Sequence, residues 1–102
     1  MLLLLPKKLN ELQSEGLRLE DVSAQFPEEL SFGDTGDNVA QVQYFLTTVA
    51  TFNNAVPDPG FSGAFDEATR DAVLAFQNYY GLPPTGTITD ATWNYLYDDY
   101  LG

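Results

Sequence analysis

Apolar side chains recur at helical spacing in three stretches of the chain. The first stretch runs from residue 37 to about 49 or 51, the second from 67 to about 80, and the third follows residue 92. Spacings of three and four residues place side chains on one face of an α-helix. The apolar positions are Val39, Val42 and Leu46 in the first stretch, Val73, Phe76 and Tyr80 in the second, and Trp93, Leu96, Tyr97 and Tyr100 in the third. This pattern predicts an all-α fold, a compact three-helix bundle with structured turns.

One short pattern precedes both the second and the third predicted helix. It reads hydroxyl residue, Gly, any residue, Phe or Ile, two residues, Ala-Thr, and it lies within residues 61–69 and 84–92. Glycine permits a tight turn, and an apolar residue just before a helix cap packs back onto the helix. We therefore expect the chain to build the same corner twice, with Phe65 and Ile88 buried.

Helix ends are marked by residues that satisfy unpaired backbone groups. Asp66 and Thr89 follow the two apolar corner residues and can accept hydrogen bonds from first-turn amides. Asp37 is a candidate cap for the first helix, since it follows the turn-rich stretch 33–36. Gly81 is placed to end the second helix.

Gln43 and Gln77 each follow an inward-facing apolar position of their helix. Two interpretations are open. The amides could bind a ligand, or each could be a buried group that holds the backbone of a corner. The second is favoured because buried polar groups are nearly always paired within the protein.

Residues 1–29 are predicted to form an N-terminal extension that packs on a main domain of residues 30–102. Within the extension, leucines 9 and 12 suggest a short helix ended by Gly16, and a second partly buried piece ends at Pro27 and includes Leu17, Leu19, Val22 and Phe26. The apolar run 1–5 is too short for a signal-peptide core, and its charges follow it instead of preceding it. Either the chain is cut from a longer exported protein, or it is made without its own export signal.

Composition narrows the chemistry that this chain can perform. It contains no Cys and no His, which removes thiolate nucleophiles and the commonest zinc ligand. Fifteen acidic and four basic residues give a formal charge of −11, which repels nucleic acids and anionic membrane surfaces. The acidic residues match no calcium-loop spacing. We therefore expect a binding or structural module without metal or cofactor, not an enzyme.

Three tyrosines fall outside the predicted apolar stripes, namely Tyr44, Tyr79 and Tyr95. Exposed aromatic rings stack on the C–H faces of sugars, and a tyrosine hydroxyl adds a hydrogen bond, so these residues are candidate glycan contacts. The alternative is that they are ordinary scattered surface aromatics.

Many residues between about 30 and 97 stand at the spacings of one known family. They are Leu30-Ser31-Phe32-Gly33-Asp34-Thr35-Gly36-Asp37-Asn38-Val39, Val42-Gln43, Leu46, Gly63-Ala64-Phe65, Ala68-Thr69, Ala72-Val73, Ala75-Phe76-Gln77, Gly81-Leu82-Pro83, Thr85-Gly86 and Thr92-Trp93. In these residues the chain resembles the small peptidoglycan-binding domain that is often appended to bacterial cell-wall hydrolases and spore proteins. Two positions depart from the pattern of that family: Ser62 stands where the family usually has Asp before the glycine, and Asp66 stands where it often has Gly.

This resemblance implies a three-helix fold that attaches without catalysis to the glycan or the stem peptide of peptidoglycan, in the cell envelope or outside the cell. We expect the contacts to come from the turn with Asp34, Thr35 and Asp37 and from the three tyrosines. Neighbouring domains of a longer chain are further candidate partners. The fold also resembles the propeptide of matrix metalloproteases, but latency through a cysteine is excluded here. The alternative function is a protein interaction or spacer module with an acidic surface.

Overall fold

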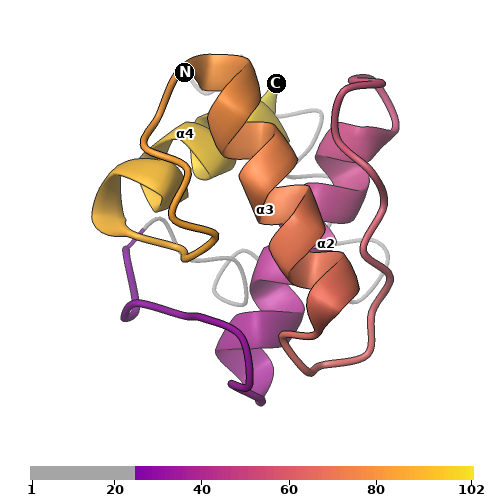
Figure 1. Ribbon diagram of the computed structural model, residues 1–102. Helices are drawn as coiled ribbons and strands as arrows, with labels where there is room; N and C mark the ends of the chain where they lie inside the picture. Colours follow the sequence, from indigo (N-terminus) through magenta and orange to yellow (C-terminus); the bar gives the residue numbers. More distant parts are fainter. Residues whose placement is uncertain (1–24) are drawn as a thin grey trace, which may run out of the picture.

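A computed structural model of the protein describes residues 25–102, and this part of the chain contains three helices (Figure 1). They are α2 (Asp37–Ala50), α3 (Glu67–Tyr80) and α4 (Asp90–Leu101). Helix α2 contacts both α3 and α4. The residues described form no strand, only two isolated bridges between loops. The predicted all-α three-helix bundle is confirmed, with helix bounds close to those expected from periodicity.

The core is richest in aromatic rings between α2 and α4. The Phe45 ring centroid lies 5.4 Å from that of Trp93 and 4.4 Å from that of Tyr100. Phe45 and Val49 are fully buried in addition to the predicted stripe of α2. A helix packed against a single neighbour buries one stripe, but α2 has neighbours on two sides and buries a wider arc.

The corner residues lie as predicted. Phe65 and Ile88 are buried, Asp66 caps α3 by accepting a hydrogen bond from the Thr69 amide, and Thr89 caps α4 in the same way. Gly81 ends α3 with a left-handed backbone, φ 72°. The exception is α2.

Asp37 was expected to cap α2, and that expectation is wrong. Gly36 occupies the N-cap position with φ 118°, and no side chain caps this helix. Asp37 is instead its exposed first residue. The physical reason lies outside the helix. The Gly36 amide donates to the Gly63 carbonyl at 3.0 Å, and this bond to the first corner sets where α2 begins.

Gln43 and Gln77 hold the two corners through the same set of bonds. The Gln43 side-chain amide donates to the Ala64 carbonyl and the Thr69 hydroxyl, both at 2.9 Å, and its oxygen accepts from the Gly63 amide at 2.8 Å. Around Gln77 the corresponding partners are Thr87, Thr92 and Gly86, at 3.0, 3.0 and 2.9 Å. Both glutamines are fully buried, so the interpretation as structural amides is confirmed.

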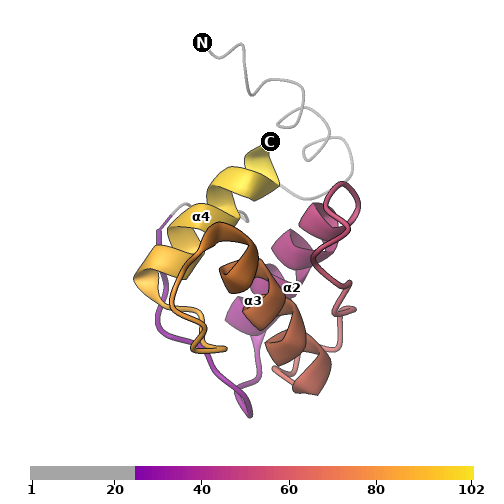
Figure 2. The same ribbon diagram turned by 45° about the horizontal axis from the view of Figure 1, so that its top comes forward.

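The segment before α2 joins the two corners to each other (Figure 2). Leu30 exchanges backbone hydrogen bonds with Ile88 of the second corner, and the Asp34 carbonyl accepts from the Phe65 amide of the first at 2.8 Å. Phe26 packs against the core, with its ring centroid 6.4 Å from that of Trp93. The other predicted contacts of the N-terminal extension fall outside the described residues, and the domain boundary at residue 30 stays a prediction.

Candidate functional site

The turn that was expected to bind ligand is largely committed to the fold. One Asp34 carboxylate oxygen accepts from the Ser31 amide at 2.9 Å, and Asp34 is half-buried. Thr35 is exposed and pairs through its backbone with Ala64. Asp37 is exposed. Thr35 and Asp37 therefore remain reachable by a ligand, whereas Asp34 mainly shapes the turn.

Tyr79 and Tyr95 come together on one surface, through a tyrosine that lies between them. The Tyr80 ring centroid is 4.9 Å from that of Tyr79 and 5.3 Å from that of Tyr95. The two outer residues are 57% and 45% exposed. We call these three residues the tyrosine patch; its rings come from the end of α3 and the middle of α4.

The middle ring of the tyrosine patch is held in place by a hydrogen bond. The Tyr80 hydroxyl donates to a carboxylate oxygen of Asp99 at 2.5 Å, and this bond, with burial, raises the pKa of Tyr80 to about 12. Tyr80 was expected only as a core position, because it lies on the apolar stripe of α3. Sequence reasoning therefore missed its second role as the link between the two exposed rings.

Tyr44 does not lie opposite the core, as the helical phase had suggested, and that expectation is corrected. It is half-buried, and its ring centroid lies 5.4 Å from that of Tyr100 and 6.2 Å from that of Phe61. Burial, followed by a side-chain hydrogen bond with Tyr44, raises the pKa of Tyr100. Packing of α4 against α2 partly covers the face of α2 that carries Tyr44, which the sequence alone predicted to be exposed to solvent.

The predicted ligand residues therefore lie on separate surfaces. The turn at residues 34–37 lies at the end of the molecule where α3 begins, and Tyr79 belongs to the other end of that helix (Figure 1). A helix of 14 residues is about 20 Å long. A single small ligand cannot contact both surfaces, although an extended polymer can.

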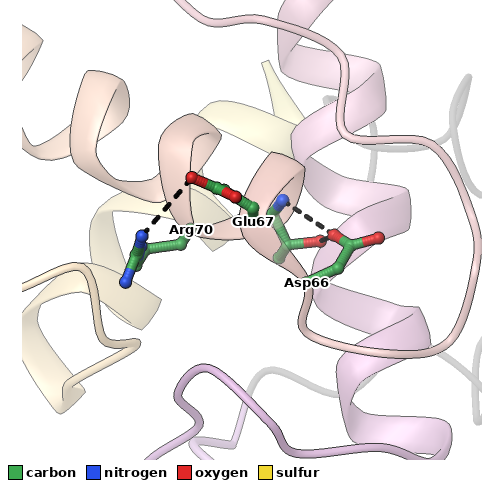
Figure 3. A network of polar contacts seen from close by, with 4 residues as sticks. Asp66, Glu67 and Arg70 are labelled. Carbon is green, nitrogen blue, oxygen red and sulfur yellow. Dashed lines mark hydrogen bonds and ion pairs between the residues drawn. The ribbon is translucent and has the colours of Figure 1, made fainter.

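A further surface beside the first turn of α3 was not expected from the sequence. The Arg70 guanidinium carbon lies 5.2 Å from the ring centroid of Phe32, which is 58% exposed. A nitrogen of the same group lies 3.7 Å from a carboxylate oxygen of Glu67 (Figure 3). One feature of the sequence could have drawn attention to this surface: Arg70 is the single basic residue after position 18.

Asp66 lies apart from Arg70 in the same view, with its carboxylate directed to Thr69 (Figure 3). The hydrogen bonds from the Thr69 hydroxyl and amide lower the pKa of Asp66, because they stabilise its ionised form. Asp66 therefore serves the helix cap.

Within residues 25–102 no three carboxylates gather as a metal site would require. In the same part of the chain, no helix combines the length and the apolar character needed to cross a bilayer.

Comparison with known proteins identifies the family of this chain. The family model described as Putative peptidoglycan binding domain matches residues 35–96, which include all of α2 and α3 and the first half of α4. A search of curated proteins found no match to the chain. Because the matched region covers more than half of the sequence and contains both repeated corners, the chain belongs to the peptidoglycan-binding domain family.

Proposed function

We propose that this protein is a noncatalytic module that binds peptidoglycan and anchors or targets a larger protein or assembly at the bacterial cell wall. The observation that carries the proposal is the family match over residues 35–96. The absence of His and Cys from the sequence supports a binding role, since neither a thiolate nor an imidazole is present to act as nucleophile or base. Its place of action would be the cell envelope or the extracellular wall.

Two of the described surfaces are suited to the glycan. The exposed rings of Tyr79 and Tyr95 can stack on sugar faces, and the fixed Tyr80 between them keeps the surface ordered. Thr35 and Asp37 offer a hydroxyl and a carboxylate at the other end of α3. We propose that the glycan strand contacts the tyrosine patch and that Thr35 and Asp37 make secondary contacts.

The alternative is a module that binds a basic protein, and the charge distribution is the observation in its favour. Among the described residues Arg70 is the one basic side chain, and eleven are acidic. Long-range attraction to a basic partner weakens as salt screens it. Peptidoglycan carries carboxylates of its own, so binding to it should stay constant or strengthen as salt rises.

Sedimentation with purified sacculi at low and high salt tests the proposal. The protein should pellet with sacculi at both salt concentrations and release no soluble fragments from them. Tyr79→Ala combined with Tyr95→Ala should weaken binding, whereas Phe52→Ala, which removes an equally exposed ring after α2, should not. Failure to pellet at either salt would refute peptidoglycan binding, and an unchanged double variant would refute only the proposed glycan surface.

A further inference from the structure

Arg70 stands where three segments from distant parts of the sequence meet. It belongs to the first turn of α3, Phe32 comes from the segment before α2, and Gly86 comes from the second corner. The backbone hydrogen bonds between Leu30 and Ile88 hold the last two segments side by side. The position of Arg70 is thus set by the tertiary fold.

The Arg70 side chain is supported along its length. A Cβ added at Gly86 would lie 3.2 Å from its Cγ and 3.6 Å from its Cδ, so the corner backbone packs against the aliphatic stem. The Phe32 ring lies against the guanidinium at the far end. A guanidinium held in this way loses less conformational freedom on binding than one on a mobile side chain.

The hydrogen-bonding capacity of Arg70 is largely unused within the described part of the chain. A guanidinium carries five N–H donors. Within residues 25–102 the guanidinium of Arg70 has the Glu67 carboxylate as its polar neighbour, at 3.7 Å, which is longer than a hydrogen bond. Glu67 is 74% exposed, and such surface ion pairs are weak. An incoming anion can therefore displace Glu67 and accept two parallel hydrogen bonds.

We propose that Arg70 and Phe32 form a site for a carboxylate of the peptidoglycan stem peptide, with the Phe32 ring packed against the peptide's apolar groups. This inference rests on the proposed function and names the part of the polymer that this surface takes. Sugar hydroxyls gain little from a cation, whereas the peptide carries carboxylates. In a chain with formal net charge −11, the guanidinium is also where the described surface can pair with an anion.

Titration of the full chain with a synthetic stem tetrapeptide, followed by amide NMR shifts, tests the site. The peptide with free carboxyl groups should bind about fivefold or more tightly than the fully amidated peptide, as expected for an exposed ion pair at the upper end of its range. Arg70→Gln should remove this difference, and Arg70→Lys should restore part of it. Glu67→Gln should tighten binding, since the competing carboxylate is gone.

Two variants that each remove one exposed phenylalanine ring distinguish binding at this site from nonspecific hydrophobic binding. Phe32→Ala should weaken peptide binding, and Phe52→Ala should leave it unchanged. Equal binding of the free and amidated peptides, an unaffected Arg70→Gln variant, or no peptide binding would each overturn the inference. Phosphate polymers attached to the wall are a second source of anions for Arg70. Sacculi from which these polymers have been removed should still bind the protein through Arg70, and loss of this Arg70-dependent binding would also overturn the inference. Sedimentation of the unaltered protein with sacculi decides the proposed function separately.

Discussion

Replacing Gln77 with leucine tests whether the buried amides hold the corners. Leucine has a similar size but cannot hydrogen-bond. In Gln77→Leu the Gly86 amide loses its acceptor at 2.9 Å, and the Thr87 carbonyl loses the nearer of its two donors, at 3.0 Å, while it keeps the Thr85 hydroxyl at 3.3 Å. Gly86 is buried, so water cannot readily replace the glutamine oxygen. Leaving the buried Gly86 amide unsatisfied costs about 1 to 3 kcal/mol, and the lost bond to Thr87 adds about 1 kcal/mol, so the unfolding free energy should fall by about 2 to 4 kcal/mol.

Gln43→Leu is the internal control, because Gln43 makes the equivalent bonds in the first corner. Its partner Gly63 is only partly buried, and water can reach the bond it leaves behind. We expect a smaller loss, about 1 to 2 kcal/mol. Both variants should retain their helical circular dichroism at low temperature.

Urea unfolding of the two variants and the parent chain, fitted with a shared slope, provides the comparison. For a domain of this size each kcal/mol also lowers Tm by about 4 to 8 °C. A cost below about 1 kcal/mol for Gln77→Leu would show that water or a backbone shift satisfies the corner. A larger cost for Gln43→Leu than for Gln77→Leu would refute the argument from burial.

Three other predictions concern the core, the N-terminal extension and pH. Phe65→Ala and Trp93→Ala should each cost about 3 to 5 kcal/mol in urea unfolding, and the half-buried Tyr44→Ala about 1 to 2 kcal/mol. A chain beginning at Leu30 should still show helical circular dichroism and a cooperative melt, at a lower Tm because the Phe26–Trp93 contact is lost; absence of a cooperative melt would contradict the predicted domain boundary. The raised pKa of Tyr80 contributes stability that is present below pH 10 and is lost as the pH rises toward 12. The unfolding free energy should therefore fall less steeply between these pH values in Tyr80→Phe than in the parent chain. Identical slopes for the two proteins would contradict this prediction.

Local features of the sequence were enough to determine the helices and the corners. Helical spacing, the caps at Asp66 and Thr89 and the stop at Gly81 depend on residues a few positions apart, and they appear in the structure as expected. The two glutamines were also interpreted correctly, because each follows an inward-facing position of its helix and a buried amide is nearly always paired within the protein.

Tertiary packing decided the rest, because the deciding contacts join residues far apart in the chain. The bond from Gly36 to Gly63 displaced Asp37 from the cap of α2, and packing against α4 left Tyr44 half-buried. The meeting of Arg70 with Phe32 likewise depends on contacts between distant segments. Periodicity within one helix reports which of its faces is apolar, but it does not report which neighbours lie against the other faces. The sequence by itself therefore determined the three helices, both corners and the caps of α3 and α4. Only the tertiary structure decided where α2 begins and which surface residues share a site.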